Sequence, residues 1–311
     1  MCCLLIWPGA GSAQTLRIAT LHAELGRKGP GVLLRDLERD PQVAAQRQLI
    51  DAIDPDILLL TKVDVDAGGQ TLAALQARFG FDHGYSEMPN SAVFAGDMRM
   101  GFGPFAGAGG MVLLSRHPID PARTRSYSAV LWKDVPGAVV PLKQDGTSFF
   151  PAAVQQSLRL ATGGLWVIES AGLHLVVFRN TTPAFDGPED RNGLRQRDQL
   201  RLISQVLDKL QAPFVAVGNT NLDPDSGDGH RAAMRDFLSR PDLQDPVPRS
   251  PMGGVKTAFW DKPGPMRVSY VLPSRDLTVT GAGVVWPASG PLRDSAEQAS
   301  RHRLVWVDIT R

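Results

Sequence analysis

The stretch "VGNTNLDP", residues 217–224, ends an apolar run with a glycine, two asparagines and an acidic turn. The run 214–218 has the length and continuous apolar character of a strand that is covered on both faces. Loops that follow such strands often carry catalytic residues. The polar side chains at this tip are Asn219 and Asn221, so the stretch predicts the shape of a catalytic edge that lacks a carboxylate at its first position.

Further runs of strand length recur on both sides of this stretch. They cover residues 16–21, 56–63, 110–115, 165–170, 173–178, 267–272, 277–286 and 303–309. Helical patterns separate some of them, at residues 40–54, 68–80, 195–211 and 230–240. Because strands occur both consecutively and separated by helices, the order favours a mixed sheet system with outer helices over a pure βαβ series.

Local signals support the ends of two predicted helices. Asp40 and Pro41 are suited to the N-cap and the first helical position of the helix at 40–54. Gly80 is suited to the position after the end of the helix at 68–80. The Gly- and Pro-rich segments 84–110 and 120–155 predict functional loops or lids, because long irregular stretches are uncommon in a compact domain.

The bulk composition is that of a globular protein. The chain has 311 residues, of which 43% are hydrophobic, and a net charge of +1. This charge makes no electrostatic case for nucleic acid or for an anionic membrane. No apolar run after the N-terminal segment reaches the ~18–20 residues of a membrane span. Since no linker interrupts the pattern, we expect a single domain at residues 16–311.

The N-terminal segment, residues 1–15, contains a short apolar stretch followed by small residues. It resembles the end of a secretory signal, although a basic region is missing, and a disordered tail is the alternative interpretation. The signal interpretation predicts an exported protein, periplasmic or secreted. Cleavage after Ala13 would remove Cys2 and Cys3, which are the only cysteines, and would leave no thiol nucleophile.

An ordered set of polar residues is the strongest functional signal. Each member is expected at the C-terminal end of a predicted strand, and such ends can converge at one rim of a sheet sandwich. The members are His22, Lys62, Arg179, Asn219, Asn221, Ser269 and His302.

Seven motifs around these residues, in this order, resemble the endonuclease/exonuclease/phosphatase superfamily. They are "RIAT", "DILLLT", "GGMVLLSRHPI", "LHLVVF", "VGNTNLDP", "RVSYVLPS" and "SRHRLVW". The resemblance runs from about residue 16 to the C-terminus, and "FDGPEDRNG" (185–193) resembles a bacterial secreted subgroup. It implies an α/β (α+β) fold: a four-layer α-β-β-α sandwich of two mixed β-sheets packed face to face, with outer helices.

The resemblance also implies which positions carry the chemistry. In active relatives, an asparagine and an acid from the first two motifs hold a divalent metal, and here those positions are His22 and Lys62. The histidine that contacts the scissile phosphate is replaced by Arg179. The acid that acts on the attacking water is replaced by Asn219, while Asn221 is retained.

The last two motifs depart in the same way. The sixth-motif aspartate is replaced by Ser269, and the acid of the final Asp-His pair by Arg301, while His302 is retained. An ammonium at Lys62 repels a metal ion: at an effective dielectric of about 20, unit charges ~4 Å apart interact by ~4 kcal/mol, and a divalent ion by roughly twice that. Asn219 cannot act as a base. These changes predict a catalytically impaired pseudoenzyme without a metal cofactor.

The substituted positions together predict a cationic cleft. Lys62, Arg179 and Arg301, with Asn221, have the charge and the donors to bind a phosphate-bearing or carboxylate ligand without cleaving it. An alternative remains for the cations. Lys62 and Arg179 would pair with Glu24, Asp64 or Asp186 in an inert cleft, as in an interaction protein without catalysis.

A further alternative is an active phosphodiester or phosphomonoester hydrolase of the nuclease or phosphatase type. Glu24 and Asp64 each lie two residues after a substituted position, on the same side if the strand continues. Together with Asp223 they would form a rearranged site for Mg²⁺ or another divalent metal.

Overall fold

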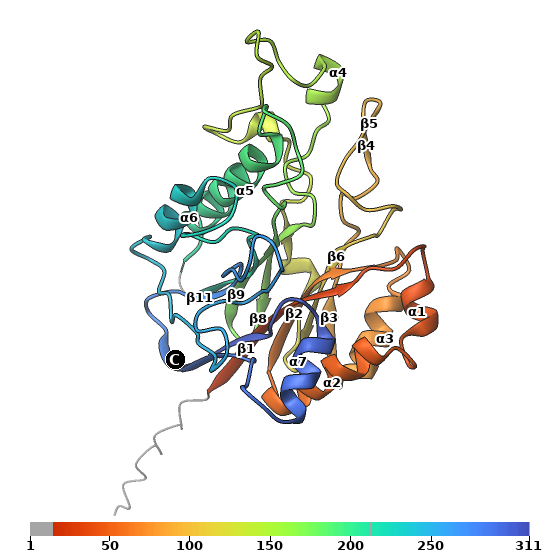
Figure 1. Ribbon diagram of the computed structural model, residues 1–311, viewed down its shortest axis with the longest axis vertical. Coiled ribbons are helices and arrows are strands. Elements are labelled where there is room, and N and C mark those ends of the chain that lie inside the picture. The colour runs from red at the N-terminus through yellow and green to blue at the C-terminus, as the bar shows by residue number, and fades with distance from the viewer. Residues whose placement is uncertain (1–14, 212, 311) are drawn as a thin grey trace, which may run out of the picture.

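The computed structural model describes residues 15–211 and 213–310, and Figure 1 shows two β-sheets stacked between helices. The signal-like or disordered segment predicted at residues 1–15 lies outside the described residues, except for Thr15. Among the residues that are described, no helix combines the length and the apolar character needed to cross a membrane.

The first sheet has six strands in the order β12-β13-β1-β2-β6-β3. Its two central strands, β1 (Leu16–Leu25) and β2 (Ile57–Val63), are parallel, and the other pairs are antiparallel. The remaining strands are β3 (His83–Tyr85), β6 (Gly110–Ser115), β12 (Thr278–Val284) and β13 (Val305–Thr310).

Four helices cover the outer face of this sheet (Figure 1). They are α1 (Val32–Asp36), α2 (Pro41–Ile53), α3 (Gln70–Phe79) and α7 (Pro291–Ala299). One buried apolar cluster joins helix residues such as Leu49 and Leu75 to the strand residues Leu21 and Leu60.

The second sheet has five strands in the order β11-β10-β9-β8-β7. They are β7 (Arg125–Ser126), β8 (Leu165–Ser170), β9 (Leu173–Arg179), β10 (Phe214–Asn219) and β11 (Ser269–Pro273). Helices α5 (Arg191–Leu207) and α6 (Arg231–Leu238) pack on its outer face, where Leu200, Ile203 and Phe237 join a second apolar cluster.

A third apolar cluster lies between the two sheets. Leu59 and Met111 of the first sheet share it with Trp166, Val177 and Val217 of the second. The layers are therefore helix, sheet, sheet and helix, which confirms the predicted α-β-β-α sandwich.

The two predicted helix boundaries are confirmed. The Asp40 side chain accepts a hydrogen bond of 2.8 Å from the Gln42 backbone, and Pro41 is the first residue of α2. Gly80 ends α3 in the left-handed region, at φ 75°. This is the conformation that favours glycine.

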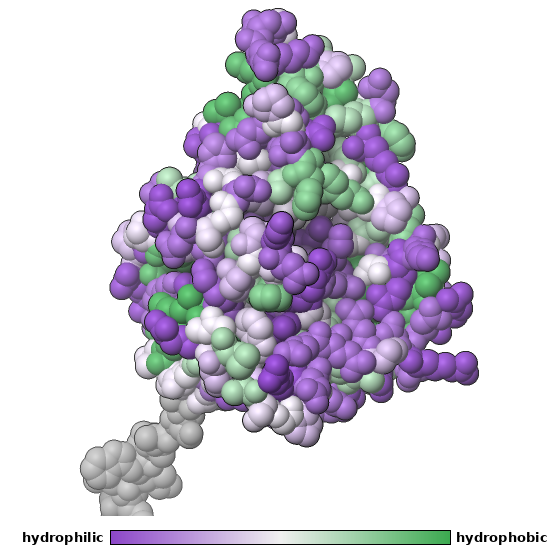
Figure 2. Space-filling view, viewed as in Figure 1, coloured by the Kyte–Doolittle hydropathy of each residue, from purple (hydrophilic) through white to green (hydrophobic). Residues whose placement is uncertain are grey.

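Segments 84–110 and 120–155 rise above the sheets in yellow and green in Figure 1. They contain the hairpin β4 (Phe94–Ala95) and β5 (Met98–Arg99), two 3-10 turns at 121–123 and 132–134, and α4 (Ala152–Gln155). Met100, Trp132 and Phe150 are buried in the same apolar cluster as α5, so side chains anchor these loops to the second sheet. Figure 2 shows apolar surface gathered in this upper region of an otherwise mostly polar face.

Candidate functional site

The ends and the beginnings of strands meet at one edge of the sandwich. His22 pairs with Thr61 across β1 and β2, and Asn219 pairs with Arg179 across β10 and β9. The sequence predicted that each of the seven polar residues lies at the C-terminal end of a strand, and this prediction is wrong for two of them. Ser269 begins β11, and His302 precedes β13. Both strands run antiparallel to a neighbour, so their beginnings lie beside the ends of that neighbour.

Residues from the two sheets are in contact at this edge. The rings of His22 and His302 lie 4.2 Å apart between centroids, and Trp260 meets His302 edge-on at 5.2 Å. The amide nitrogen of Asn219 lies 3.4 Å from Ser269 Oγ and 3.4 Å from His302 Nδ1. The structure thus brings together residues of four motifs, of which His22, Asn219 and Ser269 are substituted family positions and His302 is a retained one.

The turn after β10 orients the Asn219 amide. The Asn221 backbone N–H donates to Asn219 Oδ1 at 2.8 Å, so the Asn219 amide nitrogen faces His302. Asn221 adopts φ 53°, and its own amide donates to the Asn180 carbonyl at 2.7 Å. Because the facing amide is a donor, His302 Nδ1 must accept, which places the ring proton on Nε2.

Both histidines are held in the neutral form. Burial lowers the pKa of His302 to about 3. Burial also lowers the pKa of His22 well below its usual range, and His302 and Arg179 lower it further. His22 Nδ1 lies 2.8 Å from Thr61 Oγ1. At neutral pH the site therefore contains two neutral imidazoles and no imidazolium to act as an acid.

Lys62 and Arg179 are the cations of the site. Burial lowers the pKa of Lys62 to about 8, with Arg179 as the next cause, and burial lowers the pKa of Arg179 to about 10. The two side chains meet around Gly109. Arg179 Nη1 donates to the Gly109 carbonyl at 2.9 Å, and a Cβ at Gly109 would lie 3.4 Å from the Lys62 stem.

Neither cation forms an ion pair with any of the described residues, and Arg179 Nε is buried without a hydrogen-bond partner there. The alternative in which they form direct ion pairs with acids is therefore wrong, although Asp64 and Glu24 act on Lys62 at longer range and offset part of the lowering of its pKa. Asp186, for example, accepts from the Asn192 backbone at 2.6 Å. Two neighbouring cations that no direct ion pair neutralises make this part of the site electropositive.

A bulge in β2 directs Lys62 to this position. Leu58 and Leu60 face the helix-covered side of the sheet, where strict alternation would also place residue 62. The pairing register shifts between Thr61 and Val63, Lys62 adopts φ 62°, and Val63 takes the buried place. Bulges of this kind re-aim side chains next to active sites.

The acids of the rearranged metal site are not assembled. Glu24 binds Ser300 Oγ at 3.0 Å and the Arg301 backbone at 2.9 Å, and it pairs with the Arg301 guanidinium. Asp64 accepts from the backbones of Arg27 at 2.6 Å and Gly109 at 3.0 Å.

The third acid, Asp223, pairs with Lys256 at 2.9 Å and accepts from the Arg267 backbone at 2.6 Å. No group of three or more His, Cys, Asp or Glu residues that could hold a metal occurs in the described part of the chain. With an ammonium at Lys62 and every nearby carboxylate engaged, the residues present do not fit Mg²⁺, which needs free oxygen ligands. The alternative metal set of Glu24, Asp64 and Asp223 is therefore not supported.

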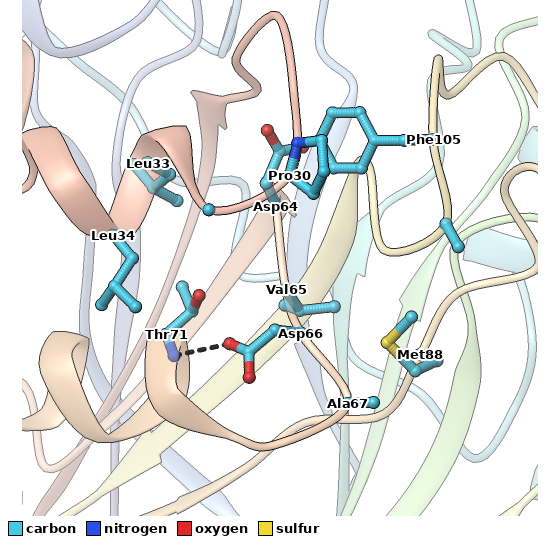
Figure 3. A pocket seen from close by; sticks show the side chains of 12 residues that line it. Pro30, Leu33, Leu34, Asp64, Val65, Asp66, Ala67, Thr71, Met88 and Phe105 are labelled. Atoms are coloured by element: carbon cyan, nitrogen blue, oxygen red, sulfur yellow. Dashed lines mark hydrogen bonds between the residues drawn. The ribbon is translucent and has the colours of Figure 1, made fainter.

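A cavity of about 160 Å³ has Asp64 in its wall, and Figure 3 shows the side chains that line it. It lies among Leu33, Met88 and Phe105, and Asp66 projects toward it. The Asp66 carboxylate accepts from the Thr71 backbone at 2.7 Å, so it caps the start of α3. Neither cation of the site lines this cavity.

The fold and the site define a class: four-layered α-β-β-α sandwiches whose polar side chains gather at one edge, where strands of both sheets meet. A family model described as Endonuclease/Exonuclease/phosphatase family matches residues 27–302. The chain therefore belongs to the endonuclease/exonuclease/phosphatase family. No match is found among curated proteins.

Solved structures of the family share the fold at low identity. An endonuclease/exonuclease/phosphatase from Beutenbergia cavernae is 22% identical, with a TM-score of 0.58 over 95% of this chain and 71% of its own. The 3′ phosphatase NExo from Neisseria, bound to product DNA hairpin, is 16% identical, with a TM-score of 0.58 over 94% and 98%. An AP endonuclease from Archaeoglobus fulgidus is 13% identical, with a TM-score of 0.57 over 94% and 98%.

Proposed function

We propose that this chain is a pseudoenzyme of its family, which binds a phosphate-bearing ligand through Lys62 and Arg179 and does not hydrolyse it. The observation that carries the proposal is the pair of neighbouring cations that form no direct ion pair with any of the described residues. They occupy the positions that match the metal-binding acid and the phosphate-binding histidine of active relatives.

An anion between these side chains would remove an energetic cost. Burying a charge without a partner is unfavourable, and the lowered pKa values of Lys62 and Arg179 reflect that cost. A phosphate oxygen can accept from the Arg179 guanidinium and from the Lys62 ammonium. Charge-assisted hydrogen bonds of this type are roughly twice as strong as neutral ones.

The same site lacks the groups that hydrolysis needs. Asn219 presents an amide donor where active relatives have the acid that acts on water. The pKa of His302, about 3, makes it a poor general acid at neutral pH. Among the residues that the structure describes, no carboxylate near Lys62 is free to hold a metal that would activate water.

Ligand binding is tested by calorimetry with inorganic phosphate and phenyl phosphate at low ionic strength. We expect saturable binding, weakened about tenfold or more in Lys62→Ala and in Arg179→Ala, since each removes one charged hydrogen bond. Lys209→Ala, which removes an exposed lysine, is the matched control and should bind as the native chain does. Absence of binding to the native chain would leave an inert cleft and overturn the proposal.

Loss of catalysis is tested by restoring the family residues. A variant with His22→Asn, Lys62→Glu, Arg179→His, Asn219→Asp and Ser269→Asp should gain metal-dependent hydrolysis of bis-nitrophenyl phosphate, while the native chain shows none with Mg²⁺, Mn²⁺, Ca²⁺ or Zn²⁺. Turnover by the native chain that disappears in Asp64→Ala or Glu24→Ala would show an active hydrolase instead.

A further inference from the structure

A second and larger cavity, of about 690 Å³, lies beside the final motif. Its size is within the range of small-molecule sites, which run from about 300 to 1,000 Å³. Its main side chains come from three places: the segment 252–265, the stretch just after β12, and the stretch just after α7. They are Met252, Phe259, Pro265, Trp286, Arg301 and Arg303. Lys62 and Arg179 do not line it.

Arg303 is a buried cation in the wall of this cavity. Its side chain is 4% exposed, and its guanidinium lies 4.4 Å from the centroid of the Trp286 ring. Nη1 donates to the carbonyls of Ser300 at 2.6 Å and Ala296 at 3.1 Å. Nε has no hydrogen-bond partner, and no carboxylate of the described residues pairs with Arg303.

The two acidic groups nearest the cavity are engaged elsewhere. Glu297, which lines it, pairs with Arg293 at 3.2 Å, and Glu24 pairs with Arg301. Arg303 is therefore a cation of the cavity wall that forms no ion pair with the described residues, and burial lowers its pKa more than the charges of Glu297 and Glu24 raise it.

The remaining wall is aromatic and aliphatic. Phe259 and Trp286 meet edge-on at 6.3 Å, and Gly253 lies against the indole, where a Cβ would come within 2.5 Å of the ring. Met252 is 46% exposed and Phe259 44% exposed, so the cavity opens to solvent along an apolar rim. Trp286 Nε1 is buried and has no hydrogen-bond partner among the described residues.

We propose that this cavity binds a small amphipathic anion, with an aromatic or aliphatic body against Phe259, Trp286 and Met252 and an acidic head group toward Arg303. Arg303, which lines the cavity and pairs with no carboxylate of the described residues, supplies the positive charge and the hydrogen-bond donors for a carboxylate or sulfonate. Apolar walls with a few polar groups are typical of such sites. The site is distinct from the one formed by Lys62 and Arg179.

Fluorescence titration with anilinonaphthalene sulfonate tests the proposal directly. The uncharged phenylnaphthylamine is the matched probe, since it retains the apolar body and lacks the acidic head. We expect saturable binding of one sulfonate probe per chain. The uncharged probe should bind about tenfold more weakly, because it lacks one charged hydrogen bond. Equal binding of the two probes, or binding that does not saturate, would overturn the proposal.

Two variants locate the binding. Arg303→Met should remove the preference for the sulfonate and retain the apolar contact. Because Arg303 also donates to two carbonyls and its loss can unfold the chain, Met252→Asp at the exposed rim is the second variant. It should weaken the sulfonate probe several-fold by charge repulsion. Leu142→Asp, an exposed apolar position remote from the cavity, should leave binding unchanged.

The outcome is independent of the proposed phosphate site. Lys62→Ala should leave the sulfonate probe unaffected, and Met252→Asp should leave phosphate binding unaffected. If Lys62→Ala loses binding of the sulfonate probe while Met252→Asp binds it as the native chain does, the probe binds at the proposed phosphate site. This result would contradict the inference.

Discussion

Asn219 reverses the direction of one hydrogen bond at the site. An aspartate at this position would accept from His302 Nδ1, whereas the amide donates toward it. Donation to Nδ1 favours the neutral ring, in addition to the effect of burial on the pKa of His302. One side chain that is nearly the same shape thus changes the protonation of another.

The Asn219→Asp variant tests this effect. A carboxylate within contact of His302 should raise its pKa from about 3 by roughly one to three units, because it stabilises the imidazolium. NMR titration of the ring resonances measures the shift. Asn221→Asp, two residues further on, is the control and should change it less. If the pKa of His302 stays the same in Asn219→Asp, the amide of Asn219 does not donate to the ring.

Lys62 is also expected to lower the stability of the ligand-free chain. Its pKa is about 8 in the folded protein and ordinary in the unfolded chain, so the unfolded state binds the proton more tightly. The charge therefore opposes folding below pH 8, and the penalty fades as pH rises from about 8 to the usual lysine pKa of about 10.4.

Lys62→Met should therefore stabilise the protein at pH 7. We expect the free energy of unfolding to rise by on the order of 2 kcal/mol, with the gain shrinking as pH increases through that window. Urea unfolding at several pH values measures it. Lys209→Met, at an exposed position, should show no such dependence. A variant less stable than the native chain at pH 7 would contradict the assignment.

At the scale of elements, two glutamines of helix α2 form hydrogen bonds both to strand β1 and to the end of helix α7. Gln46 is fully buried and donates to the carbonyls of Ala23 at 2.8 Å and Ala299 at 3.0 Å. Gln42 donates to the same two carbonyls, at 3.0 and 2.9 Å. The two glutamines thus hold β1 beside the end of α7, directly before His302.

Because the two glutamines share their acceptors, their removal should not be additive. Gln42→Ala or Gln46→Met alone should lower the free energy of unfolding by about 1 kcal/mol, since the other donor remains. The double variant should lose more than the sum, because both carbonyls are then unsatisfied. A double-mutant cycle by urea unfolding measures the coupling. Additive losses would show that the shared acceptors do not couple them.

Apolar runs predicted the central strands well because these strands are buried on two faces. β8 has the predicted bounds, and β10 extends one residue beyond its predicted run. β11 begins two residues late, since the backbones of Arg267 and Val268 donate to Asp223 and to Thr257 Oγ1 instead of to a strand. α7 was not predicted, because only a short amphipathic stretch marks it.

The site was less predictable than the fold. The substituted positions follow from the motif order, but the bulge that turns Lys62 leaves no mark in a run of apolar residues. Gly109 was predicted only as part of a functional loop or lid, yet its carbonyl accepts from Arg179 and it lies beside the Lys62 stem. The pairing of Arg301 with Glu24 depends on residues 277 positions apart, which spacing cannot reveal.

At the scale of the whole molecule, anion binding should appear as stabilisation. A ligand at a hundred times its Kd should raise the free energy of unfolding by about 2.7 kcal/mol. The phosphate-induced shift in Tm should decrease above pH 8, as the unliganded Lys62 loses its proton. Thermal unfolding with and without phosphate from pH 6.5 to about 9.5 measures this. A shift that stays constant across that range would exclude Lys62 from the site.

The proposed phosphate site takes one cation from each sheet, Lys62 from β2 and Arg179 from β9. Elsewhere the two sheets pack against each other mainly through apolar side chains, and these contacts do not depend on salt or pH. A bound anion would therefore link the two sheets at this edge, and the strength of this link would depend on salt concentration and on pH. When the anion binds, we expect amide hydrogen exchange to slow in β2 and β9 together, because local opening of both strands becomes less frequent. The average structure of the protein would not change.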